Sequence, residues 1–151
     1  MDDTRDYILS RVAHIAAQSD YVHISDDLTS VASYAHDTTG TYYEGSNILV
    51  RVEGADTDLV SAENAVLFSS HIDSVSTAAG ATDDTISIAA MLQLVEYLSK
   101  PERRPRRTAV FLFNNGEEDG LNGAHMFFEH PWSNLTSTFV NLEGSGSGGY
   151  D

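Results

Sequence analysis

The chain has 151 residues, of which 41% are hydrophobic and 9% aromatic, so it suits one folded domain and is not a disordered tail. A formal net charge of −15 argues against nucleic acid or an anionic membrane surface as the main partner, and it attracts cations. The absence of cysteine excludes disulfides and thiolate zinc sites, so any metal must be held by His, Asp and Glu.

The first third of the chain predicts a helix followed by short strands. Residues 4–17 have apolar side chains near one face at helical spacing, and residues 21–43 form short alternating pieces. Residues 47–52 are a β-branched strand candidate, and a polar loop follows over residues 55–64. No apolar run is long enough to cross a bilayer, and the start lacks a signal-peptide pattern. We therefore expect no membrane contact by this segment.

Strands and helices then alternate. Residues 65–69, 108–113 and 139–142 read as strands, and residues 86–98 and 121–128 read as helices that end before Pro101 and Pro131. Apolar strands separated by helices predict a largely parallel sheet that is covered on both faces. The basic loop over residues 103–107 is expected to be solvated, at the end of the sheet where helices lead into strands.

Acidic residues and one histidine follow the predicted strands. Ligands gather beyond the carboxyl ends of strands in such sheets, and the residues at those positions are His71 with Asp73, Glu117 with Glu118, and Glu143. Each is a residue type that binds metals. The expected site therefore lies at one edge of the sheet.

Each of these motifs also has a simpler interpretation. In an extended segment Asp73 can reach the ring of His71 and fix its tautomer, although a structural or surface pair would look the same. Asp83 and Asp84 open the central helix. Asp84 suits a helix cap, whereas the small residues before Asp83 predict a tight loop that turns this carboxylate inward, where its two oxygens can bridge two metals.

The pair Glu117–Glu118 divides two tasks between neighbouring carboxylates. One glutamate can bind a metal, and the other can take a proton from the attacking water and return it to the leaving group. The alternative is an acidic loop before a helix. Glu143 follows a strand and precedes the Gly/Ser-rich run 144–149, so it is a ligand candidate, while the run itself could be only a flexible connection.

Taken together, these motifs resemble the M28 zinc aminopeptidases. The pieces occur in the same order, and the resemblance covers residues from about 47 to 149. The residues of these motifs are most similar to those of the fungal vacuolar membrane protease branch. The resembling motifs are His71-x-Asp73-Ser74, Gly80-Ala81-x-Asp83-Asp84, Asn115-Gly116-Glu117-Glu118 with Gly120-Leu121-x-Gly123, and Asn141-x-Glu143.

The resemblance implies a fold and a set of roles. The fold would be a three-layer α/β/α sandwich with a mixed, mostly parallel sheet. Asp83 would bridge two zinc ions, with His71 and Glu143 completing one site and Glu118 binding the other. Glu117 would be the general base and acid, and Asp73 would orient His71. Peptides would be the substrates.

The chain also departs from the family pattern. Many members carry Asp where this chain has Glu143, and Ile86-Ser87 replaces a Ser-Gly pair. The last zinc ligand of the family is a histidine far downstream, and this chain stops at Asp151, so residues 1–151 are expected to be one incomplete peptidase domain, weak or inactive by itself. His125 and His130 are expected to be surface or capping residues that do not replace that ligand.

Two alternatives to a peptidase stay open. One is a non-catalytic interaction domain that keeps the fold. The other is a glutaminyl-cyclase-like acyltransferase, which uses one zinc. The vacuolar branch implies a place on the lumenal side of the vacuolar membrane in a membrane-anchored parent. In that compartment the triplet Asn134-Leu135-Thr136 would be a glycosylation site.

Overall fold

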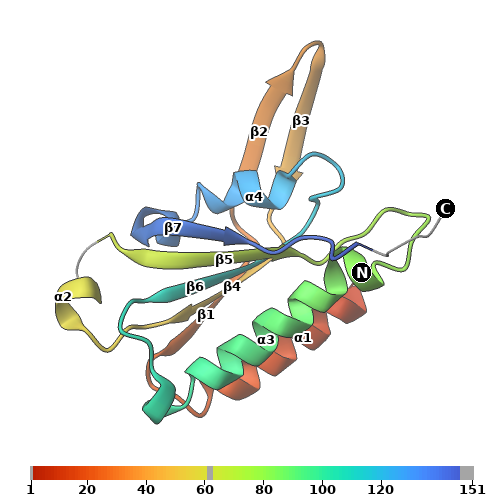
Figure 1. The fold of residues 1–151 in the computed structure, drawn as a ribbon. Helices are drawn as coiled ribbons and strands as arrows, with labels where there is room; N and C mark the ends of the chain where they lie inside the picture. Colours follow the sequence, from red (N-terminus) through yellow and green to blue (C-terminus); the bar gives the residue numbers. More distant parts are fainter. Residues whose placement is uncertain (1, 61–62, 147–151) are drawn as a thin grey trace.

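A five-stranded mixed sheet forms the centre of the molecule. The computed structural model describes residues 2–60 and 63–146, so residues 147–149 of the predicted Gly/Ser-rich run lie outside the described residues. Figure 1 shows the sheet with helices packed against it. The spatial order of the strands is β1 (Val22–Asp27), β4 (Asn47–Val52), β6 (Ala109–Asn114), β5 (Ala65–His71) and β7 (Thr136–Asn141).

Four of the five strands run in the same direction. β5 is parallel to both β6 and β7, whereas β4 is antiparallel to β6 and to β1. β4 is therefore the single reversed strand, and the carboxyl ends of β1, β6, β5 and β7 share one edge. The mixed, mostly parallel sheet expected from the alternating pattern is confirmed.

Two long helices cover one face of the sheet. α1 (Asp2–Ala16) and α3 (Ile86–Leu98) lie side by side (Figure 1). Ile8 and Val12 of α1 and Val95 of α3 are fully buried against Phe111 and Phe113 of β6. Each such side chain contributes about 1.5–3 kcal/mol through its removal from water. This helical layer fixes the position of β5 and of the segment that leads into α3.

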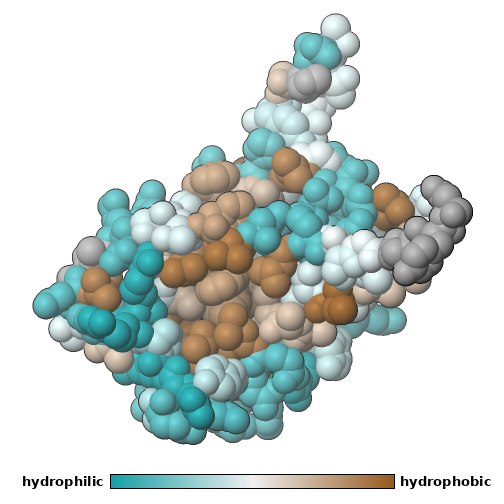
Figure 2. All heavy atoms as spheres, in the orientation of Figure 1, coloured by the Kyte–Doolittle hydropathy of each residue, from teal (hydrophilic) through white to brown (hydrophobic). Residues whose placement is uncertain are grey.

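The opposite face carries a smaller layer. α4 (Asn122–Phe127) and the 3₁₀ turn η3 (Pro131–Leu135) contribute Phe127 and Trp132, which pack on Leu49, Leu67 and Leu112 of the sheet. Helices thus lie on both faces, as the α/β/α sandwich requires. Figure 2 shows apolar side chains gathered over the strands of the large sheet, within a mostly hydrophilic surface.

A β-hairpin stands apart from the large sheet. β2 (Val31–His36) and β3 (Thr39–Glu44) pair only with each other in the described part of the chain. Figure 1 shows this hairpin projecting from the body beside α4. Among the described residues no helix is long and apolar enough to cross a membrane.

Several boundaries differ from the sequence-based expectation. β5 runs on to His71 because its last residues continue to pair with β6. β7 begins at Thr136, three residues early, because an exposed edge strand needs no apolar pattern. The predicted polar loop contains the short helix α2 (Thr57–Val60), and η2 (Pro101–Arg103) precedes the basic loop. None of these changes moves the expected site.

The basic loop lies at the opposite edge of the sheet from the expected site, as predicted. It is less solvated than expected, because its arginines hold neighbouring segments together. Arg104 donates to the carbonyl oxygens of Glu53 and Gly54, and Arg107 donates to Asn64 O. These bonds satisfy main-chain oxygens of the turns around the start of β6, which is a structural role.

Candidate metal centre

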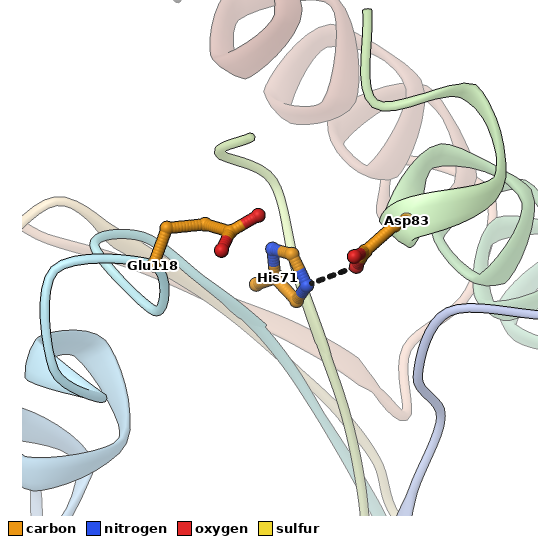
Figure 3. Close-up of side chains that lie close together, drawn as sticks. All are labelled: His71, Asp83 and Glu118. Carbon is orange, nitrogen blue, oxygen red and sulfur yellow. Dashed lines mark hydrogen bonds and ion pairs between the residues drawn. The ribbon is translucent and has the colours of Figure 1, made fainter. Parts of the chain in front are cut away.

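The predicted site residues meet at the carboxyl edge of the sheet. His71 ends β5, and Asp83 and Asp84 lie in the single wide turn η1 (Ala81–Thr85) that leads into α3. Glu117 and Glu118 occupy the loop after β6, and Glu143 follows β7. Figure 3 shows His71 between Glu118 on one side and Asp83 on the other.

Two groups of three residues have ligand atoms close enough to hold a cation. In each group the candidate atoms lie within 4.8 Å of one another, and both groups share the buried ring of His71. One group adds Asp83 and Glu118, and the other adds Asp84 and Glu143. The predicted ligands Asp83, Glu118 and Glu143 therefore all lie near His71, with Glu143 grouped with Asp84 and not with Asp83.

The ring of His71 is fixed from one side and surrounded by acids on the other. It is 2% exposed, and Nδ1–H donates to the main-chain oxygen of Asp73 at 2.9 Å. Nε2 lies 3.0 Å from Asp83 Oδ1, and the protonated ring donates to that oxygen. When Nε2 is deprotonated, its lone pair points at the same carboxylates, which is the orientation of a metal ligand.

The pKa of His71 is raised above its ordinary value. Burial alone lowers this pKa, but the bond to Asp73 O and the negative charges of Asp73, Glu117 and Asp84 outweigh it. Among the described residues, six carboxylates thus gather at the site around one histidine, His71. An excess of negative charge around one imidazole is an environment that a divalent cation would neutralise.

Asp73 holds the glutamate loop more directly than it holds His71. Its side chain is 3.7 Å from His71 Nδ1, while Oδ1 accepts the main-chain N–H of Glu117 and Oδ2 accepts that of Glu118. The sequence predicted that the carboxylate would orient the histidine. In the structure the main-chain carbonyl oxygen of Asp73 makes that contact with His71. The carboxylate of Asp73 instead links β5 to the loop after β6.

Asp83 and Asp84 point in different directions, and the expected cap at Asp84 is wrong. Asp83 is 59% exposed and reaches the ring of His71. Asp84 is 1% exposed, has non-helical torsion angles and accepts a hydrogen bond from Ser70 Oγ at 2.5 Å. Its carboxylate turns toward β5, and the start of α3 has no side-chain cap. The peptide bond between the two aspartates is cis.

Glu117 and Glu118 differ in their surroundings. Glu118 Oε1 accepts a hydrogen bond from Val75 N at 3.2 Å, whereas Glu117 Oε2 lies 4.0 Å from His71 Nε2. Burial raises the pKa of the Glu117 carboxyl above its ordinary value, and nearby acids add to this rise against the opposing charge of His71. A carboxylate with a raised pKa is suited to exchanging protons.

Glu143 reaches the site from the end of β7. Its side chain is 50% exposed, with Oε2 3.7 Å from His71 Nε2 and Oε1 accepting from Asn141 Nδ2 at 2.6 Å. The Glu143 side chain therefore reaches the ring of His71.

His125 and His130 lie in other contacts. His125 stacks on Tyr34 with 4.5 Å between ring centroids. His130 precedes η3 as its cap and accepts the main-chain N–H of Trp132, while its other nitrogen contacts Ser25. Neither belongs to a metal-type cluster of described residues, which agrees with the expectation that they do not replace a ligand.

The donor set fits a zinc ion. Imidazole nitrogen and carboxylate oxygen are zinc ligands, and no thiolate is needed. Oδ1 of the buried Asp84 has no hydrogen-bond partner among the described residues. An unpartnered carboxylate oxygen beside one imidazole and several exposed acids is costly without a positive charge nearby.

Sequence reasoning missed part of the site. Asp84 and Ser70 form a buried pair beside His71, and the two serines at the end of the apolar run, Ser69 and Ser70, were the available signal. Tyr34 and Tyr43 of the hairpin contact the glutamate loop. No local pattern marks them, because these contacts join segments far apart in the chain.

Comparisons with known proteins identify the family of the chain. The family model for peptidase family M28 matches residues 47–151. A vacuolar membrane protease from Laccaria bicolor is 55% identical over 148 residues, which is 98% of this chain and 14% of that protein. This chain therefore belongs to peptidase family M28, and it spans about one seventh of the length of that curated relative.

Solved structures show the same fold. LapB from Legionella pneumophila aligns with a TM-score of 0.70 at 15% identity, over 95% of this chain and 37% of its own. A glutaminyl cyclase from Macrostomum lignano aligns with a TM-score of 0.64 at 21% identity, over 96% of this chain and 46% of its own. At these identities the likeness establishes the fold alone.

Proposed function

We propose that this chain carries the ligand cluster of a zinc-dependent metallopeptidase, in which two zinc ions act together on peptide bonds in the manner of an aminopeptidase. The observation that supports this proposal is the convergence of His71, Asp83, Glu118 and Glu143 around an acid with a raised pKa. Membership of family M28 gives the reaction class.

The proposed roles rest on membership of family M28 together with the contacts, in which His71 is grouped with Asp83 and Glu118, and also with Asp84 and Glu143. His71, Asp83 and Glu143 would hold one zinc ion, and Asp83 with Glu118 would hold the second. Bound zinc would polarise the scissile carbonyl and make water more acidic. Glu117 would accept a proton from the attacking water and return it to the leaving amine, since its carboxyl is not held by a salt bridge to Lys or Arg in the described residues.

The second zinc site is the weaker one within residues 1–151. Its two proposed ligands are carboxylates, because the nearby His71 is assigned to the first zinc ion and His125 and His130 lie elsewhere. We propose that full activity needs a further histidine from a longer chain. The test compares hydrolysis of aminoacyl chromogenic substrates by residues 1–151 and by a longer product of the same gene, with zinc added. Strong activity from residues 1–151 would refute this part of the proposal.

The same experiment separates the two alternatives. A glutaminyl-cyclase-like protein would convert an amino-terminal glutamine peptide to its cyclic product and would bind one zinc per chain. A non-catalytic domain would bind almost no zinc and release no product. Two zinc ions per longer chain, together with release of the amino-terminal residue, are the results expected here.

The relatives also suggest a location. The Laccaria bicolor relative is named as a vacuolar membrane protease, and we propose the lumenal side of that membrane for this domain. Asn134 of the sequon lies exposed in η3, so a glycan could be attached in the lumen. Loss of mass on endoglycosidase treatment, absent in Asn134→Gln, would support this location. An unglycosylated protein in a cytosolic fraction would contradict it.

A further inference from the structure

The loop that carries Glu117 and Glu118 touches the projecting hairpin at both of its ends. Gly116 precedes the glutamate pair and Gly120 follows it, and both glycines have positive φ angles, of 78° and 115°. Tyr43 of β3 lies against the first glycine, and Tyr34 of β2 lies against the second. The glutamates therefore occupy a short turn with a tyrosine at each end.

The contact at Gly116 is one of close packing. A Cβ atom at this position would lie 2.6 Å from Tyr43 Oη and 2.7 Å from Tyr43 Cζ, distances that no side chain can occupy. The positive φ angle favours glycine, and a larger residue would also have to displace the ring of Tyr43. Tyr43 therefore packs directly against this end of the loop.

The contact at Gly120 is a hydrogen bond. Tyr34 Oη lies 2.9 Å from Gly120 O and 2.7 Å from Asn122 Oδ1, and its single hydrogen can be donated to either oxygen. The same ring stacks on His125 of α4. Tyr34 therefore ties the end of the glutamate loop to the start of α4.

The inner side of the loop is held separately. The carboxylate of Asp73 accepts the N–H groups of Glu117 and Glu118, and the turn closes on itself through bonds from Gly120 N and Leu121 N to Glu117 O. Asp73 thus fixes the loop to β5 from inside, whereas the hairpin meets it from outside. The glutamate pair lies between these two supports.

We propose that the β2–β3 hairpin positions the glutamate pair, with Tyr34 and Tyr43 acting as positioning residues through Gly120 and Gly116. The two tyrosines set where the carboxylates of Glu117 and Glu118 point, and they do not contact the reacting atoms. The functional consequence rests on the roles proposed above for these glutamates. The hold on the loop is a separate physical claim and can be tested without activity.

Matched variants of the hairpin give the first test. Tyr34→Phe removes only the hydroxyl, and Tyr43→Leu removes the ring. Tyr42→Phe and Tyr42→Leu are the controls, because Tyr42 lies between them in sequence position on the same hairpin and is 64% exposed. Hydrogen exchange is measured at the amides of residues 117, 118, 120, 121 and 122, whose hydrogen bonds define the loop.

We expect exchange at these amides to rise about tenfold in Tyr34→Phe and Tyr43→Leu. The Tyr42 variants should match the wild type, and the amides of β4 and β6 should be unchanged in all four variants. Wild-type exchange in Tyr34→Phe would overturn the proposal. An equal rise in the Tyr42 variants, or a rise throughout the sheet, would also overturn it, because the effect would then be general loss of stability.

A second readout connects the loop to the site. In a titration with Co²⁺ followed by its absorption spectrum, Tyr34→Phe should weaken the second equivalent about tenfold and leave the first unchanged. In an active form of the protein, kcat should fall about tenfold with KM within about twofold of wild type. If the variants show the expected hydrogen exchange but the wild-type protein neither binds cobalt nor hydrolyses peptides, the hold on the loop would be supported and the proposed function refuted. Weaker binding of both Co²⁺ equivalents would contradict a role limited to the glutamates.

Discussion

Two buried histidines near the carboxyl edge of the sheet have opposite surroundings. Both nitrogens of His130 are satisfied within the protein, by the N–H of Trp132 and the hydroxyl of Ser25. Only Nδ1 of His71 has a neutral protein partner, and its Nε2 faces carboxylates. The difference distinguishes a structural histidine from a candidate ligand, because a nitrogen that faces several acids is suited to binding a cation.

The same contrast holds for two buried aspartates. Asp27 accepts the N–H groups of Thr29 and Ser30, which closes a local turn. Asp73 accepts the N–H groups of two residues 44 and 45 positions away, and these residues are the glutamates of the site. Equivalent hydrogen bonds thus stabilise a turn in one place and position functional groups in the other.

The largest expected effect comes from the proposed proton-transfer residue, Glu117. Glu117→Gln removes the group that accepts and returns a proton, so kcat should fall about 10³-fold in an active form of the protein. Zinc content should stay at the wild-type value, because Glu117 is not a proposed ligand. Peptide hydrolysis and zinc per chain are measured on the same samples.

Glu118→Gln is the control for that experiment. It should lower zinc content as well as activity, since Glu118 is a proposed ligand. If Glu117→Gln lost zinc while Glu118→Gln kept it, the two assignments would have to be exchanged.

The next effect tests the two histidines directly. His71→Ala should weaken zinc binding by more than about 100-fold, because removal of a ligand exceeds the effect of removing a residue that only orients one. His130→Ala should leave zinc affinity unchanged and lower the free energy of unfolding by about 2 kcal/mol, through the loss of two hydrogen bonds. Calorimetric zinc titration and urea denaturation give the two quantities. Equal zinc loss in both variants would end the distinction between the histidines.

A smaller effect is expected at the two aspartates. Asp73→Asn leaves one acceptor for two N–H donors, so the glutamate loop loses a support and zinc affinity should fall about 10- to 100-fold. Asp27→Asn should lower the free energy of unfolding by about 1 kcal/mol and leave zinc affinity unchanged. The same titration and denaturation measurements apply. Unchanged zinc affinity in Asp73→Asn would show that the loop needs no support from β5.

Much of the sheet and of the ligand set could be predicted from sequence, for a physical reason. β4 and β6 are almost entirely buried, so they are continuous apolar runs that local pattern identifies. The ligands follow such strands, and the carboxyl ends of parallel strands meet at one edge. His71, Glu117, Glu118 and Glu143 could therefore be found without coordinates.

The remaining features depend on contacts that local pattern does not contain. The start of β7 is polar and exposed, so nothing in residues 136–138 marks a strand. Asp84 stands where caps usually stand, and only the position of Ser70 shows that it turns inward. Tyr34 reaches Gly120 across 86 positions, which is a consequence of the fold. Sequence thus predicted the candidate ligands better than the residues that contact their loop.

The smallest effect concerns the pH dependence of stability in the metal-free protein. The pKa of His71 is raised, with burial opposed and outweighed by Asp73 and other acids, so its stabilising contribution is complete below the unfolded value and is lost as pH rises through the folded value. The pKa of His130 is lowered, chiefly by burial, so its contribution is complete above the unfolded value and is lost as pH falls. The two histidines therefore change stability in opposite directions over about pH 5 to pH 8.

Asparagine substitutions separate these two contributions. The free energy of unfolding lost in His71→Asn, relative to wild type, should be larger near pH 5 than near pH 8, whereas the loss in His130→Asn should be larger near pH 8. Denaturation of the wild type and both variants with a chelator present gives these differences, and other titrating groups cancel in the subtraction. Parallel pH trends for the two variants would mean that the acids around His71 do not outweigh its burial. The two histidines would then differ in their hydrogen bonds but not in the electrostatic effect of their surroundings.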